Sequence, residues 1–463
     1  MVPGLVSLIW VVAAGNGICI FQWFFWGYSL AFSSTASNGF IGNLYHFGLR
    51  NVLDEPSPGS PLIPEILYSF FQMEFACVTV AILVGGIAER GRVFPAVIFV
   101  FLWTTLVYCP LACWAWNPSG WAFKWGVLDF AGGGPVEIGS GLSGLAFAYI
   151  LGPRHQSELV NFRPHNVSLV CLGTFLLWFG WLGFNGGSAF GANVRAVIAV
   201  WNSMLGAGMA GMVWCIMDWR YEKRWSMVGF CSGCIGGLVA ATPSSGFVHP
   251  WAGLVIGILS GVGCNLATKI KFLLKIDDAL DLFAEHAIGG IIGLICNAFF
   301  ADNAVISLDG VNTSIEGGFL DRNWKQLYIQ VAYIAATSAY SFVVTALIAK
   351  CVDLVPGCRL RGTREDEALG MDEVEIGEFA TDYIEVGRNF DDGFGKGSSS
   401  SSDATTGPGP VAAGDRHGHA ENELHWTKRP SQGGGFGGDS ELSPVDEEKS
   451  TSVEVESRNG IDA

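Results

Sequence analysis

Val136-Glu-Ile-Gly-Ser-Gly-Leu142 and Phe283-Ala-Glu-His-Ala-Ile-Gly-Gly290 place a carboxyl group and an imidazole inside stretches that otherwise read as membrane spans. Ionisable side chains in hydrocarbon cost several kcal/mol, so they are rare in membrane spans and usually face an internal pathway. Glu137 and His286 are therefore the first candidates for a functional role.

The composition around these stretches is that of an integral membrane protein. Half of the 463 residues are hydrophobic, only 15% are charged, and the mean hydropathy is +0.38, which is far above that of a soluble domain. A spanning helix needs about 20 mostly apolar residues. We therefore predict an all-α, polytopic membrane protein. Ten spans are expected, and the last of them ends near Val352. They begin near Leu5, Ile63, Val93, Val136, Val167, Val194, Met227, Trp251, Leu282 and Leu327.

The negative charge of the chain belongs to its C-terminal tail. Residues 353–463 carry 10 Lys+Arg against 24 Asp+Glu, which leaves only -2 of the net charge of -16 for the preceding residues. The acidity therefore gives no information about a substrate, and we expect no nucleic-acid partner.

Basic residues lie in alternate loops, which predicts the orientation of the chain because Lys and Arg are retained on the cytosolic side. The C-terminus is thus predicted to be cytosolic. The sequon Asn312-Thr-Ser314 falls in a loop predicted to be outside, in agreement with this topology. The predicted cytosolic face carries Arg90, Arg92, Arg154, Arg163, Arg220, Lys223, Arg224, Lys269, Lys271, Lys275, Arg359, Arg361 and Arg364.

The polar candidates also have structural explanations. Asp129 precedes a span, so its carboxylate is expected to cap the helix by accepting backbone N–H groups, although near an external cavity it would also favour an arriving cation. If Pro135 lies in the first turn and Gly134 is the cap, Glu137 falls where a Glu often closes a capping box. His286 is equally well explained as a core histidine. From the residues alone, both alternatives stay open for Glu137 and His286.

Aromatic residues make up 13% of the chain. In membrane proteins most of them anchor the interfaces or fill the core. Taken singly, Phe75, Phe184, Trp116 and Trp181 favour that explanation.

The cysteines do not predict a disulfide framework. All except Cys358 lie within or at the end of apolar spans, where they act as small hydrophobes. The CxxC of Cys231 and Cys234 lies in a Gly-rich span and is interpreted as helix packing rather than redox or metal chemistry. No enzyme motif is present, and we expect no metal or organic cofactor.

The composition divides the chain into three parts. Residues 1–352 form the expected transmembrane domain. Residues 353–386 mix charge with apolar side chains, so they are expected to dock on that domain and are a candidate regulatory segment on the cytosolic side. Residues 387–463 are acidic and Gly/Ser-rich, and we predict a disordered tail because such sequence buries too little apolar surface to offset its ordering entropy.

Five ordered motifs connect the chain to a known family. Over residues 6–352 the sequence resembles the Amt/Mep/Rh ammonium transporter superfamily in its fungal, Mep-like form. The motifs are Trp26-Gly-Tyr-Ser-Leu-Ala-Phe32, Ala88-Glu-Arg-Gly-Arg92, Asp129-Phe-Ala-Gly-Gly133, Phe179-Gly-Trp-Leu-Gly-Phe-Asn-Gly-Gly-Ser188 and Asp281-Leu-Phe-Ala-Glu-His286.

The resemblance implies a fold and roles for single residues. It implies a plasma-membrane homotrimer with one pore per subunit, each with eleven helices in two inverted five-helix repeats plus a final helix, and ammonium or methylammonium as substrate. An outer ammonium site would comprise Trp116 and Ser188 with Asp129 in support. Phe75 and Phe184 would form the pore gate beside Trp181, and Glu137 and His286 would replace the two pore histidines of many relatives.

The chemistry of ammonium fits these residue types. An aromatic face attracts the cation and Ser188 accepts one of its hydrogen bonds, whereas a bare cation in an apolar pore is prohibitively costly. Ammonia is therefore expected to cross alone while the proton passes along Glu137 and His286, so that one charge moves. The alternatives are an ammonium sensor that signals through residues 359–386 and a neutral gas channel of the Rh type.

The start of the chain departs from the family pattern. Met1-Val-Pro-Gly-Leu5 resembles the middle of the family's first span, and the residues that would connect it to the second span are missing. We therefore expect ten spans instead of eleven, and a mis-joined gene model is the favoured explanation.

Overall fold

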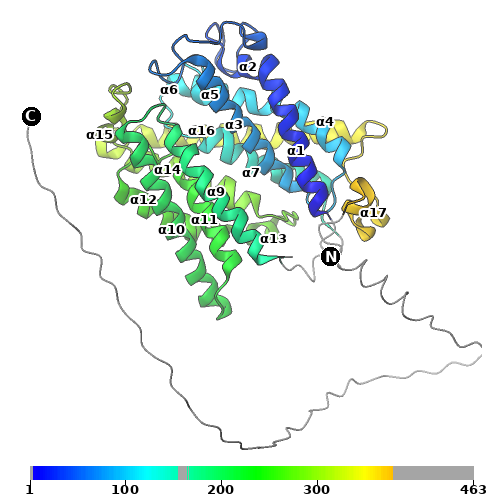
Figure 1. The fold of residues 1–463 in the computed structure, drawn as a ribbon. Coiled ribbons are helices and arrows are strands. Elements are labelled where there is room, and N and C mark those ends of the chain that lie inside the picture. The colour runs from blue at the N-terminus through cyan, green and yellow to red at the C-terminus, as the bar shows by residue number, and fades with distance from the viewer. Residues whose placement is uncertain (1–3, 155–163, 165, 379–463) are drawn as a thin grey trace, which may run out of the picture. The chain divides into compact units, whose positions relative to one another are not determined.

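The computed structural model describes residues 4–154, 164 and 166–378, which contain helices and no β-strand. Figure 1 shows the helices packed side by side in one bundle. The α-helices are α1 Leu5–Gln22, α2 Tyr28–Phe32, α3 Glu65–Leu83, α4 Val93–Trp103, α5 Cys109–Trp116, α6 Trp121–Trp125, α7 Gly139–Leu151, α9 Val167–Gly187, α10 Val194–Glu222, α11 Met227–Ala241, α12 Pro250–Ala267, α13 Ile270–Leu274, α14 Ile288–Phe300, α15 Asn303–Ile306, α16 Gln326–Leu354 and α17 Arg364–Leu369.

Short segments of other helix types interrupt or extend these helices. The π-helical segments are η1 Trp23–Gly27, η4 Thr104–Tyr108, η5 Gly133–Ile138, η6 Phe283–Ala287 and η9 Asp372–Ile376. The 3-10 segments are η2 Phe47–Leu49, η3 Val84–Ile87, η7 Ser307–Asp309 and η8 Phe319–Asp321.

All ten predicted spans are helical, and their first residues lie within three positions of the prediction. Within the part of the chain that the structure describes, eight helical segments are long and apolar enough to cross a membrane, and α11 is a shorter apolar helix. The tenth span is η5 with α7, which begins at Gly133 rather than Val136 because the π turn precedes the α-helix. The chain is therefore an all-α, multi-pass membrane protein.

Glycines allow α10, α11 and α12 to pack closely. A Cβ atom added to Gly237 would lie 2.2 Å from the carbonyl oxygen of Gly206, and one added to Gly257 would lie 2.7 Å from the same oxygen. Small residues at such contacts let helix backbones approach in lipid. The Gly-rich spans are thus packing surfaces, as are Cys231 and Cys234, which lie buried as free thiols on α11.

Loops predicted to share one face meet in an ion-pair cluster. Arg154 donates from Nε and Nη2 to the two Asp277 oxygens at 2.8 Å, and it also pairs with Glu89. Arg90 Nη2 donates to the Asp277 carbonyl at 2.8 Å. Burial alone would raise the pKa of Asp277, but the bonds from Arg154 and the nearby guanidinium charges lower it overall. Arg163, predicted on the same face, lies outside the described residues.

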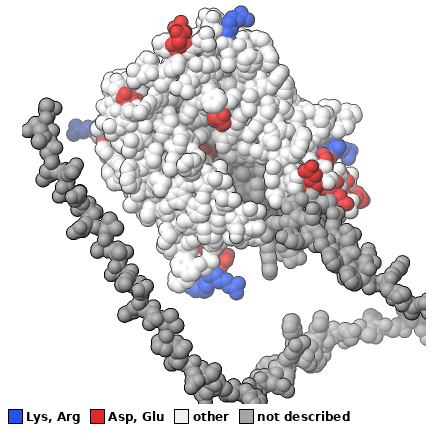
Figure 2. Space-filling view, in the orientation of Figure 1, with Lys and Arg blue, Asp and Glu red and all other residues white. Residues whose placement is uncertain are grey.

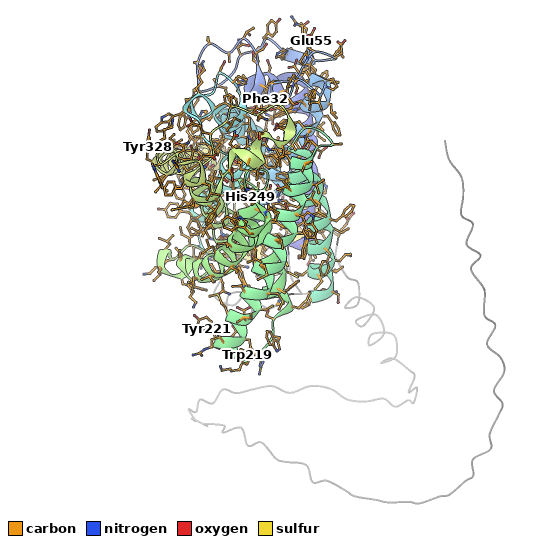
Figure 3. All side chains as sticks on the ribbon, turned by 90° about the vertical axis from the view of Figure 1, so that its left-hand side faces the viewer. Phe32, Glu55, Trp219, Tyr221, His249 and Tyr328 are labelled. Carbon is orange, nitrogen blue, oxygen red and sulfur yellow. The ribbon has the colours of Figure 1, made fainter. Side chains whose placement is uncertain are left out.

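The surface agrees with a membrane-spanning bundle. In Figure 2 most of the visible face is uncharged, and charged side chains lie mainly toward its edges. Glu55 lies at one end of the bundle and Trp219 and Tyr221 at the other (Figure 3). Both aromatic residues lie near the end of α10 and are exposed, as expected at a boundary between hydrocarbon and water.

The segment after α16 packs on the bundle. Glu375 Oε1 lies 3.0 Å from Arg92 Nε, and Asp372 Oδ1 accepts the Ser7 backbone N–H at 2.7 Å. Thr363 begins α17 with a capping box. These contacts agree with the predicted docking of residues 353–386 as far as residue 378, whereas residues 379–386 and the predicted disordered tail, 387–463, lie outside the described residues.

Candidate functional site

Glu137 and His286 meet in the centre of the bundle. Glu137 lies on η5 and His286 on η6, and Glu137 Oε2 is 2.8 Å from His286 Nδ1. The two residues are 0% and 7% exposed. A π turn inserts one extra residue into a helix and is frequent at functional sites. The two turns thus direct an acid and an imidazole toward each other across 149 positions of sequence.

The capping-box explanation of Glu137 is wrong. Gly132, not Gly134, caps η5, and the Glu137 side chain pairs with His286 instead of a backbone N–H at the helix start. The other oxygen, Oε1, is buried without a hydrogen-bond partner among the described residues. A buried oxygen without a hydrogen-bond partner costs free energy, so Oε1 does not add to the stability of the fold.

Asp129 holds the start of η5, as its predicted capping role requires. Its Oδ1 accepts the backbone N–H groups of Gly132 and Gly133 at 2.9 and 2.6 Å, and its Oδ2 accepts that of Gly134 at 2.7 Å. Tyr333 donates its hydroxyl to the same Oδ2 at 3.1 Å. The carboxylate is therefore held by four hydrogen-bond donors.

Two phenylalanine rings are stacked across the bundle. Phe75 on α3 and Phe184 on α9 lie 4.0 Å apart between ring centroids at an interplanar angle of 16°. Trp116 meets Phe75 edge-on at 5.7 Å, and Trp181 lies 5.6 Å from Phe184. Trp181 is fixed by a 2.9 Å hydrogen bond to Thr242 Oγ1. The four aromatic candidates thus form one continuous group and are not scattered anchors.

A cavity of about 500 Å³ adjoins Phe75 of this stack, and we call it the vestibule. Phe75, Trp116, Asp129 and Ser188 all line it. Trp116 Nε1 donates to the Asp129 carbonyl at 3.2 Å, and Ser188 Oγ donates to the Phe184 carbonyl at 2.9 Å. The serine oxygen therefore keeps its lone pairs for a ligand.

A second cavity of about 340 Å³ adjoins Phe184 and opens at the protein surface between α3 and α9, where Glu74, Leu176 and Leu177 are exposed. Glu137, Trp181 and Phe184 line it together with apolar residues of α3 and α9. Phe75 lines the first cavity and Phe184 the second. The vestibule thus adjoins the ring stack at Phe75, and the second cavity adjoins it at Phe184 and contacts Glu137.

Sequence reasoning missed several residues at these cavities. Glu74, an exposed carboxylate in the middle of α3, lines the second cavity. Arg195 lines the vestibule and pairs with Asp309. Gln330 bonds to the Leu128 backbone from both ends of its amide and so holds the segment before Asp129. Glu74 could have been found from the sequence, because it is a charged residue inside an apolar span. No local sequence pattern predicts the pairing of Arg195 with Asp309.

Comparisons with known proteins agree with one another. The model of the Ammonium Transporter Family matches residues 4–381. "Ammonium transporter MEP3" of Saccharomyces cerevisiae is 54% identical over 404 residues, covering 84% of this chain and 82% of that protein. The crystal structure of Saccharomyces cerevisiae Mep2 superposes with a TM-score of 0.73 at 46% identity, covering 77% and 82% of the two chains. A structure described as "Sensor Amt Protein" reaches 0.68 at 28% identity, covering 80% and 98%.

Proposed function

Because this chain belongs to the Ammonium Transporter Family, we propose that it carries ammonium inward across the plasma membrane by separating the ion into ammonia and a proton. The observation that carries the proposal is the combination of vestibule, stacked rings and Glu137–His286 pair. Each part suits one step of that separation.

The vestibule provides the binding step. Ammonium carries four N–H donors and one charge, so the face of Trp116 attracts it by cation–π interaction while Ser188 accepts a hydrogen bond. Asp129 lies behind this site and adds a negative charge that its backbone donors hold in place. Methylammonium has the same charge and one donor fewer, and it is the second expected substrate.

The ring stack provides the barrier step. Phe75 and Phe184 are separated by 4.0 Å and leave no room for a hydrated ion. Since moving a bare cation into such surroundings costs far more than moving a neutral molecule, ammonium gives up its proton near the gate and ammonia passes alone.

Glu137 and His286 provide the route for the proton. A carboxyl group and an imidazole at 2.8 Å share one hydrogen bond, along which a proton passes from one group to the other. Passage of ammonia along the pore and of the proton along this pair moves one positive charge per cycle. Glu137 thus tunes a relay that many relatives build from two histidines.

The proposal includes the assembly and the orientation of the protein. We place the C-terminus in the cytosol, because the basic loops that meet around Asp277 lie at the same end as the segment after α16. A homotrimer with one pore per subunit is the expected assembly, and cross-linking in native membranes would test it.

Currents from proteoliposomes on a solid-supported membrane test the function. Saturable, ammonium-dependent currents are expected from the wild-type protein. Ammonium uptake without current would instead support a neutral gas channel, and binding with neither current nor uptake would contradict transport.

A sensor is the second candidate. Two observations favour it, namely the docked segment with Glu375 against Arg92 and the likeness to a structure described as a sensor. Truncation after residue 358 distinguishes the two functions, because a transporter keeps its ammonium dependence whereas a sensor loses its cellular response while still binding ammonium.

A further inference from the structure

The vestibule wall contains a buried cation that the proposed pathway does not use. Arg195, in the first turn of α10, is 4% exposed. Its guanidinium carbon lies 4.9 Å from the ring centroid of Phe130 and 5.0 Å from that of Phe247, and Nε donates to the Gly246 carbonyl at 2.8 Å. All three contacts belong to segments that wall the vestibule or adjoin its wall. A permanent positive charge is therefore fixed beside a cavity proposed to receive a cation.

Asp309 balances this charge. Its Oδ2 lies 2.6 Å from Arg195 Nη1. Three further donors hold the carboxylate, namely the backbone N–H groups of Val311 and Asn312 at 2.8 Å and the Asn312 side-chain amide at 2.6 Å. Burial alone would raise the pKa of Asp309, but these bonds and the charge of Arg195 lower it overall. Asp309 therefore stays ionised, and the pair carries no net charge.

The remaining charged groups that line the vestibule leave a small negative balance. Lys325 and Glu316 face each other at 3.7 Å and cancel. Asp129 is then the uncompensated charge among the residues that the structure places around this cavity. The field that a cation meets on entry thus depends on Arg195 remaining neutralised.

We propose that Arg195 and Asp309 form a charge-balanced pair that sets how readily ammonium enters the vestibule. The inference rests on the proposed function, because it concerns entry of the same ion. Arg195 joins α10 to the segments that carry Phe130 and Phe247, and Asp309 removes the repulsion that this arginine would exert on ammonium. Both are positioning residues, since they act through the vestibule wall and its potential.

The size of the effect follows from Coulomb's law. A cavity of about 500 Å³ is about 10 Å across. At that distance one uncompensated charge, at an effective dielectric constant of about 25 to 50, changes the binding of a monovalent cation about 3- to 10-fold. Because Arg195 and Asp309 are buried, added salt screens this effect only weakly.

Three variants test the pair by the sign of their effects on concentration-dependent ammonium uptake into proteoliposomes. Asp309→Asn leaves the guanidinium uncompensated, so the apparent KM is expected to rise about 3- to 10-fold with the maximal rate within twofold of wild type. Arg195→Met keeps contact with both rings but frees the carboxylate, so KM is expected to fall. The double variant is expected near the wild-type KM.

Glu55→Gln is the matched control. It removes one negative charge at the same end of the bundle (Figure 3), from a residue that does not line the vestibule. Its KM is expected to stay unchanged under the conditions in which the two single variants are measured.

Opposite shifts of the single variants and their cancellation in the double variant support the proposal. If both single variants impair uptake in the same direction, the pair is only a structural clamp and the inference is overturned. If Asp309→Asn does not fold, because a buried unpaired guanidinium is costly, then Arg195→Met decides, and an unchanged or raised KM overturns the inference. Absence of saturable uptake by the wild type would instead overturn the proposed function, and this inference with it.

Discussion

Replacement of Asp129 by Asn tests whether one carboxylate holds the start of η5. In the wild type its two oxygens accept three backbone N–H groups and the Tyr333 hydroxyl. In Asp129→Asn the remaining carbonyl oxygen keeps the hydrogen bonds from Gly132 and Gly133. The new amide nitrogen is itself a donor, so the Gly134 N–H loses its acceptor. The variant is therefore expected to lose stability and transport together.

The magnitude follows from these contacts. A buried N–H left without an acceptor costs about 1–3 kcal/mol, and the two bonds that persist lose the strength given by the charge. We expect a destabilisation of about 3 kcal/mol. Tyr333→Phe is the matched control, because it removes a single hydrogen bond to the same oxygen and is expected to cost about 1 kcal/mol.

Unfolding of the purified, detergent-solubilised proteins, followed by intrinsic fluorescence, measures both costs. Uptake assays on the same preparations are expected to show a loss of at least about tenfold for Asp129→Asn, while Tyr333→Phe keeps most of its activity. Equal destabilisation of the two variants would refute the reasoning, since it would mean that the charge and the Gly134 bond contribute nothing to the fold.

Three further predictions concern other parts of the bundle. Glu137→His is expected to keep transport with an altered pH dependence of uptake, and identical pH profiles would remove Glu137 from the relay. Gly237→Ala is expected to lower the free energy of unfolding by about 1–3 kcal/mol, because the new Cβ would lie 2.2 Å from the Gly206 carbonyl oxygen. Gly208→Ala is the control: a Cβ there meets no atom within 4 Å, so this variant is expected to be neutral in the same unfolding assay. The pKa of Asp277 is lowered in the folded chain. The ionised Asp277 therefore contributes fully to the stability of the fold above the carboxyl group's unfolded pKa of about 4, and this contribution is lost as the pH falls through the lower pKa of the folded state. The difference in Tm between wild type and Asp277→Asn should therefore be constant from about pH 8 to 5 and narrow below about pH 4, and a gap that widens there would contradict the assignment.

The spans were predictable because each is a long apolar run bounded by polar residues. Helix starts such as Val93, Val167, Val194 and Met227 coincide with the predicted residues. The π turns were not predictable, since nothing in the Gly-rich sequence before Ile138 distinguishes them from ordinary helix. The inverted repeat and the regulatory role of residues 353–386 stay predictions.

The parts of the candidate site that were predictable are those where an ionisable residue stands inside an apolar span. Glu137 and His286 stood out as ionisable groups in apolar sequence, and the structure brings them to within 2.8 Å of each other, whereas their role in a pore stays a prediction. Arg195 and Asp309 were missed because 114 positions separate them and each is common at the end of a helix. Their pairing depends on how three outer segments fold together, which no local pattern encodes.

The central claim is that the proton of ammonium travels through Glu137 and His286 while ammonia uses the pore. Simultaneous measurement of charge and ammonium flux in proteoliposomes tests it most directly, with Glu137→Gln beside the wild type. We expect the wild type to move about one charge per ammonium, and folded Glu137→Gln to lose both the charge movement and the ammonium flux. Undiminished charge movement by Glu137→Gln, or wild-type flux without charge, would contradict it.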